Sequence, residues 1–302
     1  MGKFLIALAL LTMLGAAGSY AFWAQQRPVS HYLSDLRIQV DPDQGSPGDR
    51  GNVLGVETAL SAGDYQSLER LHLKLAAYLQ EAREHGLINA KTVVVLPEQV
   101  GTWLWAVGEK PQLYLAEERK EAQHWLALSN PLRFAWAYLT ASGQDRLADA
   151  RLRMKAADMA RDYQQLFGGL AQEFAVTLVA GTIVLPAPYI DEGVLHPGSG
   201  ALYNVSVVFS PEGQALSQPQ RQLRPAANEQ GYLTDAGDEP LQVFETPAGR
   251  LGLLVGPDVR DAANHQRLTA LSAQLVVVPA AQAGIQPWAG HGGKPRLRNQ
   301  WR

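Results

Sequence analysis

The sequence predicts an α/β protein that follows a hydrophobic N-terminal helix. Three mostly apolar, β-branched segments carry this prediction: TVVVLPE at residues 92–98, VTLVAGTIVL at 176–185 and LVVVP at 275–279. Runs of this kind are typical of strands that are covered on both faces. Between them, residues 64–85 have apolar side chains at helical spacing. We therefore expect buried strands that alternate with amphipathic helices.

The composition of the 302-residue chain is that of an ordinary globular protein. Its net charge is −3 with both signs scattered, so the sequence predicts no nucleic-acid partner. Cysteine is absent, which excludes disulfides, thiolate metal sites and thiol nucleophiles. We expect no metal and no cofactor, because the histidines lack metal-ligand spacing. They are His31, His72, His85, His124, His196, His265 and His291.

Residues 1–24 form a hydrophobic segment with Lys3 near its start. This length just spans a bilayer, and its first part also fits the apolar core of a signal peptide. Small residues at 16–19 offer a cleavage site, whereas Phe22 and Trp23 are typical of an interfacial anchor. We expect an uncleaved anchor and an exported body that faces the periplasm or the cell exterior. The alternative is secretion after cleavage.

The first elements of the body follow a linker at residues 25–33. An alternating segment at 36–40 predicts a strand, and the glycine- and proline-rich stretch 41–51 predicts a loop. The helix at 64–85 has Gly86 at its end, where glycine commonly stops a helix.

The middle of the chain, residues 103–159, is rich in tryptophan and has a helical pattern. We expect two or three helices inserted over the mouth of a pocket, with aromatic residues that serve packing more often than substrate binding. An amphipathic helix at 162–174 then leads into the strand at 176–185. Within that strand, Gly181 predicts a point where another segment approaches closely.

The C-terminal half predicts further strands and turns. These are a strand at 202–209 with a turn at 210–213, a polar loop at 220–229, a hairpin formed by 242–246 and 250–255, and the strand at 275–279. Residues 282–302 contain glycine, proline and basic residues without apolar periodicity, which predicts an irregular tail. The main domain is thus expected to span residues 34–281.

Two of the predicted strands end in a proline and a carboxylate. Pro97 and Glu98 follow the run that begins at residue 92, and Gly256, Pro257 and Asp258 end the sequence RLGLLVGPD. Functional groups of α/β sheets lie beyond the carboxyl ends of strands, so these two ends could face one pocket. Taken alone, Glu98 is also consistent with a solvated loop residue.

The order of the segments resembles the nitrilase, or carbon–nitrogen hydrolase, superfamily over roughly residues 36–279. The matching pieces are VVVLPE, YQQLFGGLAQEFAVTLVAGTIV, LYNVSVVFSPEG and VFETPAGRLGLLVGPD. The resemblance implies a four-layer αββα sandwich. It also implies an incomplete C-terminus, because the family continues after the LVVVP-like strand with a helix and further strands. Missing strands would expose an apolar sheet edge.

The resemblance also implies site residues. In this family a Glu deprotonates a Cys, a Lys stabilises the oxyanion, and an acyl-thioester is hydrolysed. The general base corresponds to Glu98 and a supporting Glu to Glu229. The lysine position falls at Arg221 or Gln222, and the nucleophile position at Gly256. With no cysteine to replace it, we expect a member that has lost activity on amides and nitriles.

Two alternatives remain. The first is an active amidohydrolase that acts on a small-molecule amide or nitrile through Glu98, Arg221 and an activated water. The second is a non-catalytic binding protein that forms a homodimer through the edge at residues 275–279.

Overall fold

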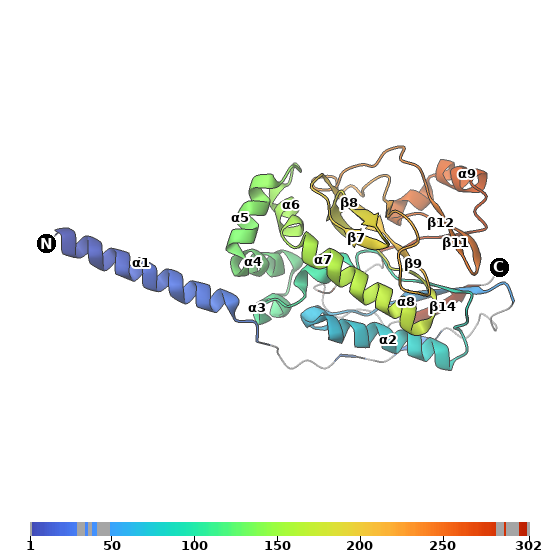
Figure 1. The fold of residues 1–302 in the computed structure, drawn as a ribbon, viewed down its shortest axis with the longest axis horizontal. Helices are drawn as coiled ribbons and strands as arrows, with labels where there is room; N and C mark the ends of the chain where they lie inside the picture. Colours follow the sequence, from blue (N-terminus) through green and yellow to red (C-terminus); the bar gives the residue numbers. More distant parts are fainter. Residues whose placement is uncertain are drawn as a thin grey trace.

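The computed structural model describes residues 2–28, 34–35, 38–40, 49–281, 287 and 296–300. Helix α1 (Gly2–Gln25) projects from a mixed α/β body, as the sequence predicts (Figure 1). Among the described residues, one helical span, Lys3–Gln25, is long and apolar enough to cross a membrane. None of its most apolar window is buried against the body.

The first sheet has six strands in the order β1-β14-β2-β3-β4-β9. They are β1 (Gln39–Val40), β14 (Arg296–Gln300), β2 (Asn52–Glu57), β3 (Thr92–Val95), β4 (Thr177–Val179) and β9 (Val208–Phe209). Strands β2, β3 and β4 run parallel at its centre, with β9 antiparallel to β4.

Two three-stranded sheets and a hairpin complete the β-structure, in the orders β10-β8-β5, β11-β12-β13 and β6-β7. They comprise β5 (Ile183–Pro186), β6 (Tyr189–Asp191), β7 (Val194–His196), β8 (Leu202–Ser206), β10 (Gln220–Arg221), β11 (Val243–Thr246), β12 (Gly249–Leu253) and β13 (Leu275–Val277). The predicted hairpin is confirmed, because β11 and β12 pair antiparallel.

The main helices pack against the sheets or gather at one end of the body (Figure 1). They are α2 (Leu68–Glu84), α3 (Pro111–Leu115), α4 (Arg119–Ser129), α5 (Pro131–Thr140), α6 (Arg146–Arg153), α7 (Ala156–Tyr163), α8 (Gly169–Phe174) and α9 (Ala262–Ala270). Shorter helical turns span Ala62–Gln66, Thr102–Ala106, Gln164–Gly168 and Gly256–Arg260. The turn Gln164–Gly168 joins α7 and α8 into one continuous segment.

The core is layered as an αββα sandwich requires. On β3, Val94 packs in the cluster that contains residues of α2, α7 and α8. Its neighbours Val93 and Val95 point the other way, into a cluster with Leu251 and Leu253 of β12. Successive residues of a strand face opposite sides, so β3 is covered by helices on one face and by a second sheet on the other. Helix α9 covers the outside of that second sheet.

The strand prediction for residues 176–185 is wrong in one respect, because this segment forms two strands in different sheets. The chain turns at Gly181, where φ is +62°. A Cβ added there would lie 2.2 Å from the carbonyl oxygen of Pro97. The expected close approach is therefore confirmed, and it is the approach that ends β4.

Strand β2 was not predicted from the sequence, although it lies beside β3 at the centre of the sheet. Its residues alternate between buried and half-buried, but Asn52, Gly55 and Glu57 dilute the apolar pattern. The predicted strand at 36–40 appears only as β1, since residues 36–37 lie outside the described part of the chain.

The prediction of an irregular tail is wrong for residues 296–300, which form β14. This strand pairs with β2 through the backbone, and such pairing needs no apolar periodicity. The predicted tail otherwise lies outside the described residues except Pro287.

The tryptophan-rich region contains more helices than predicted. Helices α3 to α6 gather at the end of the body from which α1 leaves (Figure 1). The aromatic residues divide: Trp103 and Trp105 are buried, whereas Trp136 on α5 is exposed.

Candidate functional site

Glu98 is positioned by the end of β3. Its N–H donates to the carbonyl of Ala280, 3.2 Å away, beyond the end of β13. The next residue, Gln99, has a φ of +64°, a conformation that is unfavourable for a side-chain-bearing residue. The Gln99 N–H donates to the buried hydroxyl of Thr182 at 2.7 Å. This turn directs the Glu98 carboxylate into the protein.

Gly256 lies directly opposite, beyond the end of β12. A Cβ built on it would be 2.9 Å from Glu98 Oε1 and 3.2 Å from Oε2. Its φ of +52° lies in the left-handed region that favours glycine. The two strand ends singled out in the sequence therefore meet, and any side chain at position 256 would touch the Glu98 carboxylate.

Asn204 on β8 is the hydrogen-bond donor of this site, and the sequence reasoning missed it. Its Nδ2 donates to Glu98 Oε1 and to Gln222 Oε1, both at 3.0 Å. Among the described residues, Asn204 Oδ1 and Gln222 Nε2 are buried without a hydrogen-bond partner. The YN pair in LYNVSVVF was the signal that could have identified Asn204.

The structure separates the two residues at which the lysine position could fall. Gln222 faces Asn204 across the strands, and its N–H donates to the Asn204 carbonyl at 2.8 Å. Arg221 points to the other face, because neighbours along a strand alternate. There its guanidinium pairs with Glu239 at 2.6 Å and stacks 4.2 Å from the ring centre of Tyr203. The structure thus brings Gln222, and not Arg221, to the Glu98 network.

Glu229 is buried on the far side of Gln99. Its Oε1 accepts from Gln99 Nε2 at 2.9 Å, and its Oε2 accepts from the Ala226 N–H at 3.3 Å. Burial raises the pKa of Glu229 above its ordinary value.

Burial and the nearby Glu229 charge raise the pKa of Glu98 to about 7, although the hydrogen bond from Asn204 opposes this rise. The Glu98 carboxyl therefore keeps its proton to a higher pH than a solvent-exposed glutamate does.

Asp258, the carboxylate of the second strand end, has a structural role. Its side-chain oxygens accept from the N–H groups of Leu223 at 2.7 Å and Arg224 at 3.1 Å. These contacts hold the segment that follows Gln222. Burial raises the pKa of Asp258 despite both hydrogen bonds.

The space beside Glu98 is small. A cavity of about 30 Å³ is lined by Glu98, Pro97, Thr58 and Trp103, among others. One water molecule occupies roughly 30 Å³ in the liquid, whereas ligand pockets commonly measure about 300–1,000 Å³. The Glu98 side chain therefore borders room for about one water.

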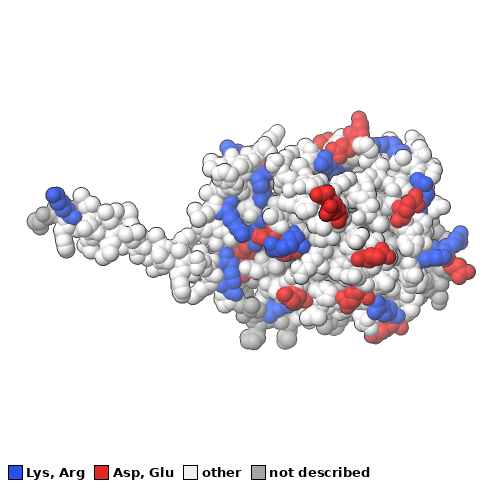
Figure 2. All heavy atoms as spheres, in the orientation of Figure 1, with Lys and Arg blue, Asp and Glu red and all other residues white. Residues whose placement is uncertain are grey.

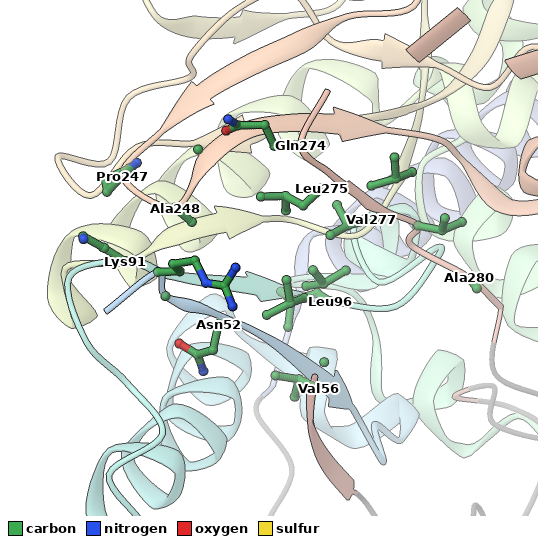
Figure 3. Close-up of a pocket in the computed structure, with 18 of the residues that line it drawn as sticks. Asn52, Val56, Lys91, Leu96, Pro247, Ala248, Gln274, Leu275, Val277 and Ala280 are labelled. Carbon is green, nitrogen blue, oxygen red and sulfur yellow. The ribbon is translucent and has the colours of Figure 1, made fainter. Parts of the chain in front are cut away.

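A larger cavity of about 1200 Å³ lies on the other side of Pro97, between β2 and β3 on one side and β13 on the other. Figure 3 shows Leu96, Leu275 and Val277 lining it, with Lys91 and Asn52 nearer one end. Glu98 is not among its lining residues. Within the described ranges of the chain, no group of three or more His, Asp or Glu side chains is placed to hold a metal ion.

The family model for carbon-nitrogen hydrolases matches residues 58–291. This stretch covers most of the sequence, and the chain belongs to the carbon-nitrogen hydrolase family. A search of curated proteins finds no match.

Solved structures similar to the chain belong to the same superfamily. A carbon-nitrogen hydrolase from Helicobacter pylori G27 is 19% identical over 76% of this chain and 60% of that chain, with a TM-score of 0.46. Saccharomyces cerevisiae Nit3, a member of branch 10 of the nitrilase superfamily, is 17% identical over 78% of this chain and 68% of that chain, with a TM-score of 0.46. An amidase from Nesterenkonia sp. is 15% identical over 78% of this chain and 66% of that chain, with a TM-score of 0.45. The chain spans only 60% of the first of these proteins.

Proposed function

We propose that this protein is a catalytically inactive member of the carbon-nitrogen hydrolase family. The observation that carries the proposal is the contact between Gly256 and Glu98: the position facing the candidate base bears only a hydrogen atom. A covalent mechanism loses many powers of ten in rate without its nucleophile. Gln222, at the place where an oxyanion-stabilising cation would be needed, is uncharged.

The test is a turnover assay on the full-length protein in detergent, with short linear amides and nitriles and a sensitive measurement of released ammonia. We expect no turnover above that of a heat-inactivated sample, and no acyl adduct in the intact mass. Amide hydrolysis that disappears in Glu98→Gln would contradict the proposal, since it would show a working base.

A second candidate is an amidohydrolase in which Glu98 activates water. It is favoured by the pKa of about 7, suited to a general base at neutral pH, and by the water-sized cavity at this side chain. It predicts a slow activity that follows the ionisation of Glu98. Running the same assay with and without a chelator separates this reaction from one that depends on a bound metal.

We also propose that α1 is an uncleaved membrane anchor that holds the body on the periplasmic or outer side. Support comes from the contacts at its C-terminal end. Lys110 Nζ donates to the Trp23 carbonyl and lies 4.1 Å from the Trp23 ring centre. Just beyond the helix, Arg27 lies 3.6 Å from the buried carboxylate of Glu109. The intact mass of the membrane-extracted protein should include residues 1–24, and loss of this segment would favour a secreted form.

The edge of β13 supports a further proposal, that two copies associate. Within the described strands, β13 ends its sheet, and its Leu275 and Val277 border the larger cavity (Figure 3). An apolar strand edge is a template for pairing with another chain. Light scattering coupled to size exclusion in detergent should give the mass of a dimer, and a monomer at every concentration would contradict it.

A further inference from the structure

Helix α5 presents an apolar face that the body does not cover. Leu132 is 84% exposed, and Trp136 and Leu139 are each 71% exposed. Their spacing of four and three residues places them on one side of the helix. The one fully buried residue of α5 is Ala137. The helix thus turns its large apolar side chains away from the protein.

The neighbouring helices carry further exposed leucines. Leu115 at the end of α3, Leu128 on α4 and Leu147 on α6 are also exposed, at 80%, 52% and 49%. Helix α5 packs on α6 and α4, which brings these leucines to the same end of the body. We call the six residues the α5 surface: Leu115, Leu128, Leu132, Trp136, Leu139 and Leu147. Large apolar side chains that are exposed on neighbouring helices at one end of a protein often mark an interaction site.

The α5 surface lies where α1 enters the body. Tyr20, near the C-terminal end of α1, donates its hydroxyl hydrogen to the carbonyl of Leu128, a member of the surface. Lys110 holds the last turn of α1 through the carbonyls of Trp23 and Gln26. Figure 1 shows α4 and α5 at the end of the body from which α1 projects. A bilayer crossed by α1 would therefore lie against this end.

The side chains around the α5 surface suit a membrane interface. The ring centres of Tyr20 and Trp23 lie 5.7 Å apart, with their planes tilted by 31°, near the end of the span, the level where aromatic residues concentrate. Trp136 adds an exposed indole, and Arg133 lies in the first turn of α5. Arg146, the first residue of α6, donates to the carbonyl of Tyr138 near the end of α5 at 2.8 Å. Figure 2 shows Lys and Arg side chains along the end of the body from which α1 leaves. Amphipathic helices that lie in the headgroup region combine these features.

We propose that the α5 surface inserts into the interfacial layer of the bilayer that α1 spans, so that the body lies against the lipid with α5 in the membrane plane. The proposal rests on α1 being an anchor. The bound partner is the lipid surface, because α1 brings a bilayer to this end whether or not another protein is present. A second copy of the chain could cover the α5 surface only if the bilayer around α1 left room for its body at this end.

Site-specific spin labelling tests the proposal without background, because the chain contains no cysteine. Leu139→Cys reports on the α5 surface. Leu73→Cys on α2 is the matched control, because Leu73 is a comparably exposed leucine, at 68%, on a helix outside the α5 surface. Leu10→Cys reports on the middle of α1. Each full-length variant carries a nitroxide and is reconstituted in phosphatidylcholine–phosphatidylglycerol vesicles.

The measurement compares the collision of each nitroxide with dissolved oxygen, which concentrates in lipid, and with a water-soluble nickel chelate. We expect the ratio of oxygen to nickel collisions to be several-fold higher at position 139 than at position 73, and highest at position 10. A label at Leu132→Cys should repeat the result for position 139. Circular dichroism of each variant checks that the fold is retained.

Three other results would overturn the proposal, and they differ from one another. If position 10 lies in lipid but position 139 matches position 73, α1 is an anchor and the α5 surface stays in water. If position 139 is shielded from both reagents, a protein covers the surface. If position 10 is accessible to nickel, α1 does not span the bilayer, and the proposal falls together with the anchor.

Discussion

Glu98 illustrates how one buried carboxyl group couples ionisation to stability. Its pKa is raised from 4.5 to about 7, first by burial and then by Glu229. The folded chain therefore keeps a proton that the unfolded chain releases between these pH values. The free energy of unfolding should fall as the pH rises from about 4.5 to 7, by roughly 3 kcal/mol for this group.

Glu98→Gln should remove this loss. Glutamine keeps an oxygen that can accept from Asn204 and carries no charge. Above pH 7 the variant should be more stable than the parent by up to roughly 3 kcal/mol, and the difference should vanish near pH 4.5. Urea unfolding at several pH values measures it. Glu212→Gln, the same substitution at an exposed position, serves as the matched control.

Gly256→Ala should destabilise the fold by roughly 2–3 kcal/mol, since it adds a contact at 2.9 Å to a left-handed conformation. Gly86→Ala is the matched control, because Gly86 has a φ of +69° but nothing within 4 Å of its added Cβ. It should cost roughly 1 kcal/mol. In the Glu98→Ala background the cost of Gly256→Ala should fall toward the control value, and an unchanged cost would show that Glu98 is not the obstacle.

The residue scale also shows what the sequence could and could not predict about the site. The resemblance placed Glu98 and Gly256 in related roles, and the structure brings them into contact. It left Arg221 and Gln222 undecided, because the choice depends on the register of β10 against β8. The sequence analysis also missed Asn204. This residue lies 106 positions after Glu98 in the sequence, and only the folding of the strands brings its side chain to the Glu98 carboxylate.

At the scale of elements, the end of β4 depends on one glycine. The sequence showed an apolar run through residues 176–185, which predicts one strand. The carbonyl of Pro97 occupies the space where a side chain at Gly181 would lie, so the chain turns there and continues in another sheet. The same contact holds the segment that carries Glu98.

Gly181→Ala should therefore be more damaging than Gly256→Ala. Its Cβ would lie 2.2 Å from a backbone oxygen, which cannot rotate away as the end of a side chain can. We expect a loss of roughly 3 kcal/mol or more in the free energy of unfolding. Gly108→Ala, at a φ of +70° in open space, should cost roughly 1 kcal/mol. If Gly181→Ala and Gly108→Ala had equal effects, the close approach of the Pro97 carbonyl to Gly181 would be contradicted.

At the scale of the whole molecule, a buried ion pair joins parts of the chain that lie far apart in the sequence. Lys155 Nζ lies 2.9 Å from Glu109 Oε1, and both side chains are almost fully buried. Glu109 Oε2 accepts from Asn130 at 3.0 Å and lies 3.6 Å from Arg27. This cluster connects the segment after α1 with α4 and α7, beside the α5 surface.

Lys155→Met should destabilise the body by about 3 kcal/mol, because it leaves the Glu109 carboxylate buried without its closest cation. Adding Glu109→Gln should restore much of the stability, since the unpaired charge is then absent. The exposed Arg161→Met, which removes surface ion pairs, should cost less than about 1 kcal/mol. Chemical unfolding of the four proteins measures these differences. A double variant as unstable as Lys155→Met would contradict the pairing.

The sequence by itself determined the α/β class, the apolar N-terminal helix and the absence of a thiol nucleophile. Each depends on composition or local periodicity, which a single segment carries in its own residues. Only the tertiary structure decided where β4 ends, which strands pair with β2 and with β14, and which side chains surround Glu98. These features depend on contacts between distant segments, and a hydrogen bond or steric clash across strands leaves no periodic trace in either one.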